Sequence, residues 1–376
     1  MLKVNLEDLE KVLPYYYKLR QSLYLWGKPS SGKTSMIRQF AQQKARELGL
    51  EYSEQKFGEK YFTCKILILS QMDSPDLRGM PELTSGEGNL KITKFVPSEE
   101  LPRNGQGIIF FDELNLAGDD VRAACMQYIL EGTYGVLPRL KDKNGSDSFW
   151  RVAASNSEQD YCAVNTTSMA LLRRFCHLEV EPELDEILKY MYDNNLDSRI
   201  SAYLKNFPED LWPRVWDEKL LDKKANPFPY TWDIAARLIE DVQSKTDLIH
   251  LVASCVGEEV AVRFHAFCKL IGKLDINRLI RKPQNEISEI AKSDEKASLY
   301  YAIVSSLTSY WYQKNKSLTA KKVIQIAALL PPEYAVAFLK FVLRKRGNQL
   351  KALPETNVLA RNLGIYLEED DEEKDK

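Results

Sequence analysis

Short apolar runs alternate with segments of helical periodicity through the first half of the chain. The helical segments carry apolar residues three or four positions apart, the spacing of one helix face, as at Val121, Ala124, Cys125 and Tyr128. Strands are predicted from the apolar runs at residues 23–26, 64–69, 108–111, 151–154 and 176–180. This alternation predicts an α/β fold, a five-stranded parallel sheet with helices on both faces, over residues 1–181.

The connection between the second and third predicted strands is long, and connections of that length usually serve a function. Within it, apolar and polar residues alternate over residues 90–96, which predicts an inserted β-hairpin. The polar segment 141–148 reads as a turn and predicts a second hairpin tip.

Strand patterns stop after residue 181, and helical periodicity continues to residue 366. A second, all-helical part is therefore expected there. The last residues, 367–376, are nearly all charged and acidic overall, which predicts a solvated, disordered tail.

The composition is that of a globular protein of two or three domains, with 376 residues, 44% of them hydrophobic. The net charge of −2 provides no overall positive field, so neither nucleic acid nor a membrane surface is an expected partner. There is no run of about eighteen apolar residues and no apolar leader, so we expect a soluble cytoplasmic protein. Its six cysteines form no C-x-x-C pair, which predicts free thiols, and its three histidines are too scattered for a zinc site.

A glycine-rich segment directly follows the first predicted strand and fits the pattern G-x-x-x-x-G-K-[ST] at every fixed position. Gly27 and Gly32 let the backbone curl around a phosphate, Lys33 reaches its oxygens, and Thr34 offers a hydroxyl to Mg²⁺. The alternative is a chance glycine-rich turn, but the strand before it and the helix after it favour ATP binding. The predicted nucleotide-binding residues here are Gly27, Lys28, Pro29, Ser30, Ser31, Gly32, Lys33, Thr34 and Ser35.

Two carboxylates end the third predicted strand, as in a Walker B motif. Asp112 is the predicted partner of Thr34 in holding Mg²⁺, and Glu113 is predicted to orient and polarise the attacking water. Asn156 follows the fourth strand at the same edge of the sheet, where open α/β sheets bind ligands. The alternative for Asp112 and Glu113 is an acidic turn after a buried strand. The alternative for Asn156 is a turn asparagine that hydrogen-bonds its own backbone.

Arg173 and Arg174 lie just before the fifth predicted strand. An arginine at a subunit edge can stabilise transition-state charge on a neighbour's γ-phosphate. The alternative is a solvated face of salt-bridging arginines, and the pair alone does not separate the two.

In order and type these motifs resemble the AAA+ ATPases. The segments 76–81, 111–115 and 172–175 are more closely similar to the MoxR branch. The resemblance implies a P-loop AAA+ core, a helical lid over residues 182–274 and a helical C-terminal extension over 275–366. It also implies a homo-oligomeric, usually hexameric, ring with ATP bound between subunits.

By the same resemblance, Asn156 matches sensor 1 and Arg174 matches the arginine finger. The family remodels protein substrates in a chaperone-like way, and its partners often carry von Willebrand factor A domains. Tyr230 stands where related sequences tend to place a sensor 2 arginine, and Arg237 lies about two helical turns further on.

Three functions remain open at this stage. The first is a Mg²⁺-dependent ATPase that remodels a partner protein, the second a nucleotide-gated assembly scaffold with incidental turnover, and the third a nucleic-acid motor. Glu113 favours the first over the second, and the mild acidity of the chain disfavours the third.

Overall fold

The chain divides into two compact units, Met1–Glu183 and Leu184–Lys376. The computed structural model describes residues 1–85, 91–133, 137–142, 145–156, 169–213, 225–240, 242, 244–271, 274–294, 296–312, 318–351 and 353–363. The predicted acidic tail and Cys162 lie outside these residues, and the other five cysteines are free thiols.

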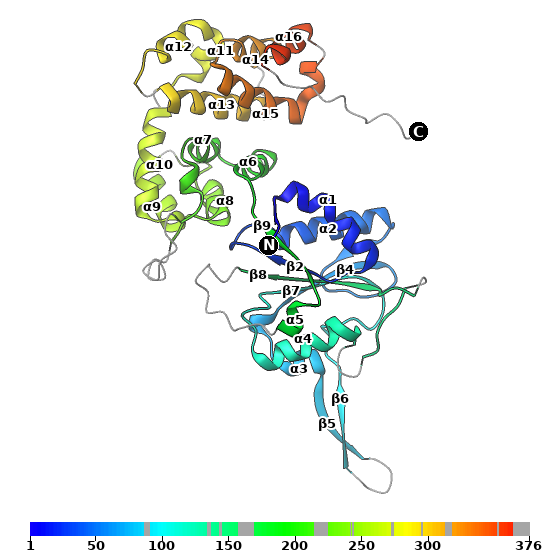
Figure 1. The fold of residues 1–376 in the computed structure, drawn as a ribbon. Helices are drawn as coiled ribbons and strands as arrows, with labels where there is room; N and C mark the ends of the chain where they lie inside the picture. Colours follow the sequence, from blue (N-terminus) through cyan, green and yellow to red (C-terminus); the bar gives the residue numbers. More distant parts are fainter. Residues whose placement is uncertain are drawn as a thin grey trace. The chain divides into compact units, whose positions relative to one another are not determined.

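The first unit is built on a seven-stranded sheet in the order β1-β9-β2-β8-β7-β4-β3, with every pair parallel (Figure 1). Its strands are β1 (Lys3–Val4), β2 (Leu23–Trp26), β3 (Glu51–Ser53), β4 (Tyr61–Ile68), β7 (Gln106–Asp112), β8 (Phe149–Ser155) and β9 (Cys176–Val180). The five predicted strands are all present, but the predicted number is wrong. The two additional strands, β1 and β3, form the sheet edges and are too short to show a periodic pattern.

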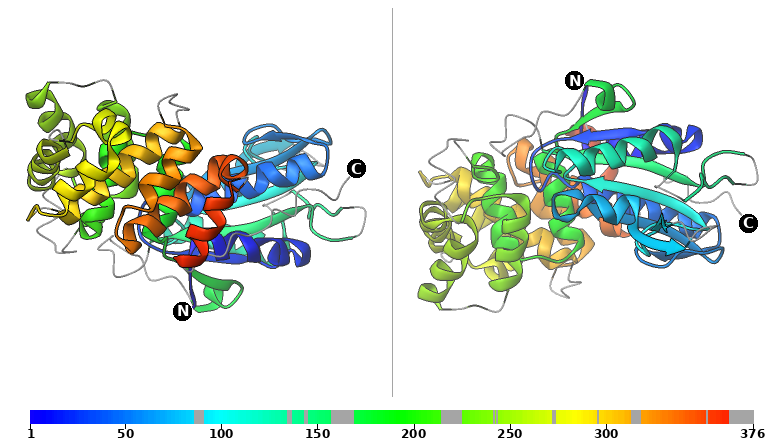
Figure 2. Two further views of the ribbon diagram at one scale, coloured as in Figure 1. Left: turned by 90° about the horizontal axis from the view of Figure 1, so that it is seen from above. Right: turned by 90° about the horizontal axis from the view of Figure 1, so that it is seen from below.

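Helices cover both faces of this sheet (Figure 1, Figure 2). Alternate residues of β2 serve the two faces: Leu23 and Leu25 belong to one hydrophobic cluster, and Tyr24 and Trp26 to the other. The first cluster is completed by α1 (Leu6–Leu19) and α2 (Lys33–Glu47), and the second by α3 (Ser74–Arg78), α4 (Asp119–Glu131) and α5 (Met169–Leu172). A sheet buried on both faces explains why β2 and the middle of β7, residues 108–111, are continuously apolar.

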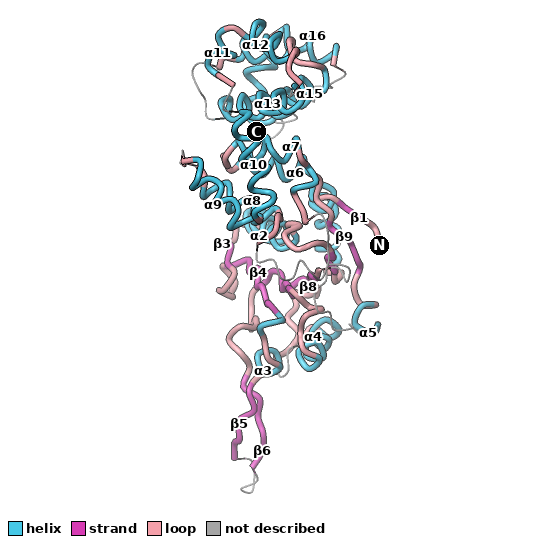
Figure 3. The backbone as a smooth tube through the Cα atoms, turned by 90° about the vertical axis from the view of Figure 1, so that its left-hand side faces the viewer, coloured by secondary structure: helices cyan, strands magenta, loops and turns pink. Residues whose placement is uncertain are grey.

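The predicted insertion is confirmed as an antiparallel hairpin of β5 (Met80–Ser85) and β6 (Lys91–Val96). It extends away from the sheet and its helices (Figure 3).

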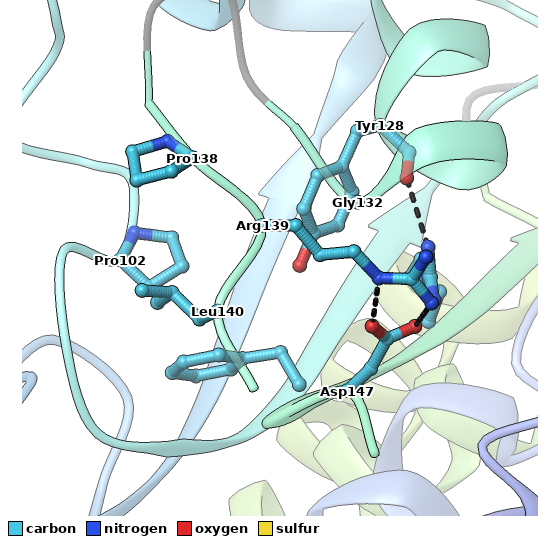
Figure 4. A pocket seen from close by; sticks show the side chains of 9 residues that line it. Pro102, Tyr128, Gly132, Pro138, Arg139, Leu140 and Asp147 are labelled. Carbon is cyan, nitrogen blue, oxygen red and sulfur yellow. Dashed lines mark hydrogen bonds and ion pairs between the residues drawn. The ribbon is translucent and has the colours of Figure 1, made fainter. Parts of the chain in front are cut away.

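The second predicted hairpin tip contains a bridge between Lys141 and Asp147, with residues 143–144 outside the described range. Asp147 at its base is contacted by Arg139 (Figure 4). Arg151 forms a second ion pair with Asp147. Arg151 also donates to the Tyr128 and Ile129 carbonyls at the end of α4, at 3.0 and 3.2 Å.

The second unit is helical, as predicted, and consists of α6 (Leu184–Asp193), α7 (Ser198–Asn206), α8 (Pro229–Leu238), α9 (Lys245–Val256), α10 (Glu258–Ile271), α11 (Ile276–Arg281), α12 (Pro283–Ile290), α13 (Lys296–Tyr312), α14 (Ala320–Ala327), α15 (Pro332–Lys351) and α16 (Pro354–Asn362). One hydrophobic cluster runs through it, from Ile187 to Leu350. Across the described part of both units, no helix has the length and apolar character that a membrane crossing requires.

Candidate functional site

The glycine-rich loop joins the end of β2 to the start of α2, and its backbone depends on its glycines. Gly27 has a φ of 148°, and a Cβ atom there would lie 2.4 Å from the Val180 carbonyl oxygen. Gly32 has a φ of 87° and is the N-cap of α2, with no side chain capping that helix end. No N-cap side chain therefore accepts from the first N–H groups of this helix, and such a helix end suits an anion.

Lys33 lies at the centre of this loop and is buried, with 7% of its surface exposed. Its Nζ donates to the carbonyls of Gly27 and Lys28, at 2.7 and 2.9 Å, and to Ser31 Oγ at 3.2 Å. The loop thus surrounds the Lys33 ammonium group. A bound phosphate would accept hydrogen bonds from the same N–H donors. Of the other predicted loop residues, Lys28 and Pro29 are half-buried, and Ser30 and Ser35 are exposed.

Thr34 and Asp112, the two predicted metal ligands, lie in direct contact. Thr34 Oγ1 donates to Asp112 Oδ2 at 2.9 Å, and the Glu113 N–H donates to Asp112 Oδ1 at 3.1 Å. Burial raises the pKa of Asp112, and the hydrogen bonds and the nearby Lys33 charge only partly oppose that rise. Among the described residues no group of three or more His, Cys, Asp or Glu side chains is placed to hold a metal. One hydroxyl and one carboxylate beside a phosphate loop suit Mg²⁺, which keeps several waters and phosphate oxygens as ligands.

Glu113 begins the turn after β7 in the left-handed region, with a φ of 57°. A side chain in that region costs about 1–3 kcal/mol, and such strain is concentrated at functional sites. Its carboxylate accepts a hydrogen bond from Ser70. Ser70 belongs to a single turn, Leu69–Gln71, that follows β4, and the last residue of β4 pairs with Asp112. Sequence reasoning missed Ser70, whose one signal is its position after a strand at this edge.

Asn156 directly follows β8, whose last residue, Ser155, pairs with Trp26 at the end of β2. The Asn156 carbonyl accepts a hydrogen bond from Asn115 Nδ2 at 3.2 Å. The structure thus brings Lys33, Thr34, Asp112, Glu113 and Asn156 to the carboxyl edge of the sheet.

Arg173 and Arg174 lie at the opposite edge. They come just before β9, whose first residue, Cys176, pairs with the first residue of β2. Arg173 is exposed and Arg174 is half-buried. Strands rise about 3.3 Å per residue, so the length of β2 separates these arginines from the phosphate loop of their own chain.

The two positions considered for sensor 2 lie in α8 of the second unit. The Tyr230 side chain is 64% exposed. Arg237 forms an ion pair within its own helix, with Nε 2.9 Å from Asp233 Oδ2 and a terminal nitrogen 3.1 Å from Oδ1. The structure therefore assigns the Arg237 guanidinium a local carboxylate partner.

No protein-family model matches this chain, and no curated protein matches it. Among solved structures, it is similar to a RuvB mutant of Thermotoga maritima, at 13% identity over 74% of this chain and 76% of that one, with a TM-score of 0.33. A putative ATPase from Cytophaga hutchinsonii has 10% identity over 97% and 91%, with a TM-score of 0.32. Hsp104 with ATPγS and FITC casein has 14% identity over 70% and 46%, with a TM-score of 0.33. Likeness at this level carries no argument about family or function.

Proposed function

We propose that this protein is a Mg²⁺-dependent ATP hydrolase. The observation that carries the proposal is the contact between Thr34 and Asp112 next to the buried Lys33 ammonium. A cation, a hydroxyl and a carboxylate at the mouth of an uncapped helix are the groups that bind a triphosphate and its metal. No other described feature of the chain explains why these three should be gathered there.

Each residue at this edge has a role in the proposed reaction. Lys33 and the loop N–H groups bind the phosphates, and Thr34 and Asp112 hold Mg²⁺, which neutralises developing charge when bound. Glu113 accepts a hydrogen bond from the attacking water and orients it, and Asn156 hydrogen-bonds the γ-phosphate or that water. All of these groups follow the strands of a single rigid sheet. A rigid sheet suits a reaction that depends on positioning.

We propose further that the active form is a homo-oligomeric ring of the AAA+ type, with MoxR-like features, in which Arg174 completes a neighbour's site. The support is the placement of Arg174 at the sheet edge opposite its own phosphate loop. ATP turnover would then drive remodelling of a protein partner, with von Willebrand factor A domain proteins as one candidate class. The division of the helical part into a lid and an extension at residue 274 belongs to the same proposal.

A second candidate, a nucleotide-gated scaffold with incidental turnover, is favoured by one contact. Ser70 holds the Glu113 carboxylate, and a carboxylate so engaged has one fewer acceptor site for water. A scaffold and an ATPase bind the nucleotide alike and differ in the rate of phosphate release.

The test is nucleotide affinity and phosphate release measured together in wild type and Lys33→Ala. We expect Lys33→Ala to lose ATP binding and turnover. The matched control is Arg46→Ala, which removes one positive charge from the same helix at an exposed position. Equal ATP affinity in Lys33→Ala and wild type contradicts the proposal, and tight binding with no phosphate release in wild type favours the scaffold.

A further inference from the structure

Asn115 is a buried polar side chain that joins the two catalytic strand ends. It is 1% exposed and lies in the turn after β7. Its N–H donates to Ser155 Oγ at 3.1 Å, and its Nδ2 donates to the Asn156 carbonyl at 3.2 Å. Ser155 Oγ also lies 2.8 Å from the Tyr24 hydroxyl, inside the sheet. A chain of hydrogen bonds therefore runs from β2 through the end of β8 to the turn that carries Glu113.

The orientation of the Asn115 amide follows from its partner. The Asn156 carbonyl can only accept, so the amide nitrogen must face it. The other amide atom, Asn115 Oδ1, is buried and has no hydrogen-bond donor among the described residues. Leaving a buried acceptor unsatisfied costs about 1–3 kcal/mol. A leucine, which has the same branched shape, would avoid that cost, so packing alone does not account for an asparagine here.

Three hydrogen bonds fasten the Glu113 turn to the end of β8. Besides the two made by Asn115, the Leu114 N–H donates to the Ala154 carbonyl at 3.2 Å. They involve three successive residues of β8 and its continuation, Ala154, Ser155 and Asn156. Glu113 itself has a strained backbone, which persists only where its surroundings hold it. These three hydrogen bonds are donated by residues within two positions of Glu113, and Asn156 itself accepts one of them.

We infer that Asn115 is a positioning residue for the hydrolytic step: it holds the Glu113 turn and Asn156 at a fixed separation through its bonds to Ser155 and Asn156. This inference rests on the proposed ATPase function. Asn115 is buried, so it acts on the attacking water only through Glu113 and Asn156. The phosphate loop follows a different strand, and among the described residues Asn115 makes no bond to it, so we expect nucleotide affinity to depend on Asn115 much less than turnover does.

The test is Asn115→Leu, which keeps the branched shape and the number of side-chain heavy atoms and removes both polar atoms. We expect kcat to fall about 10- to 100-fold, because misplacement by about 1 Å can cost that much. The KM for ATP and the nucleotide Kd should stay within about 2-fold of wild type. Ser155→Ala, which removes the acceptor of the Asn115 N–H, should lower kcat in the same way but less, and it keeps the test available if Asn115→Leu does not fold.

Thr63→Val is the matched control. Thr63 is fully buried and donates to the Lys56 carbonyl at 2.6 Å, so this change also removes a buried hydrogen bond from the first unit. It should lower the melting temperature and leave kcat unchanged.

An unchanged kcat in Asn115→Leu overturns the inference while leaving the ATPase intact. So does a loss of kcat that comes with an equal loss of ATP affinity and a lower melting temperature, because that is a folding defect. A wild type without phosphate release, or one indifferent to Lys33→Ala, overturns the proposed function as well.

Discussion

Thr34 Oγ1 lies 2.9 Å from Asp112 Oδ2, across 78 residues of sequence. This bond joins the first turn of α2 to the last residue of β7, where the Asp112 carboxylate is half-buried. Burial is the largest influence on Asp112, and it raises the pKa of the carboxyl above its ordinary value of 3.8. The ionised Asp112 carboxylate therefore destabilises the folded state at neutral pH.

The substitution Asp112→Asn should stabilise the folded protein at neutral pH. An acid whose pKa is higher in the folded than in the unfolded state destabilises the fold once both states are ionised. That penalty is absent below the unfolded pKa and grows as pH rises toward the folded pKa. Urea unfolding should thus give Asp112→Asn a larger unfolding free energy than wild type at neutral pH, with the difference shrinking toward pH 3.8. A variant less stable than wild type at neutral pH contradicts this account.

The substitution Asp147→Ala should strongly destabilise the first unit. Asp147 is 7% exposed and is contacted by Arg139 and the 5% exposed Arg151. Removing one partner of a buried ion pair typically costs about 3–5 kcal/mol, because the other charge stays buried. Urea unfolding measures the loss.

An exposed ion pair provides the control for Asp147→Ala. Glu7 and Lys11 pair at 2.9 Å on the surface of α1, so Glu7→Ala should cost far less than Asp147→Ala, because water screens exposed ion pairs. Similar losses of unfolding free energy in the two variants would mean that water screens the ion pairs of Asp147 with Arg139 and Arg151 as it screens an exposed pair.

The proposed shared site predicts complementation between two inactive variants. Arg174→Ala should bind ATP and hydrolyse it about 10³-fold more slowly than wild type, as loss of an arginine finger does. Mixed with Glu113→Gln, it should regain part of the activity, because some interfaces then combine an intact arginine with an intact glutamate. Light scattering must show that the two variants assemble together. A mixture that co-assembles and stays inactive, or a dilute wild-type monomer with full activity, places the arginine's role elsewhere.

The five predicted strands and the glycine-rich loop were found because each has a pattern within its own short stretch of sequence. The five predicted strands have four or more residues, with apolar residues in continuous or alternating order, and the glycine-rich loop has a fixed spacing, so each could be found from sequence. The edge strands β1 and β3 have two and three residues, which is too few for a pattern of period two. Their pairing is decided by the neighbouring strands and not by their own residues.

Two contacts between distant residues were not predicted from the sequence. Ser70 and Glu113 are 43 residues apart, and Asn115 and Asn156 are 41 apart. A serine or an asparagine in a turn is ordinarily explained by local backbone bonds. The sheet brings these residues together, because parallel strands end at one edge whatever the length of chain between them. The positions of these residues in the sequence therefore gave no indication of the hydrogen bonds that the sheet brings about.

In the proposed reaction Glu113 acts on the attacking water and takes no part in nucleotide binding. The most direct test measures Mg²⁺-dependent phosphate release and ATP affinity side by side in wild type and Glu113→Gln. Glu131→Gln, the same change at an exposed position in α4, is the control. We expect turnover to fall about 10²- to 10⁴-fold in Glu113→Gln, with ATP affinity retained. Glu131→Gln should keep the turnover of wild type. Turnover in Glu113→Gln equal to wild type would contradict the proposed role of Glu113.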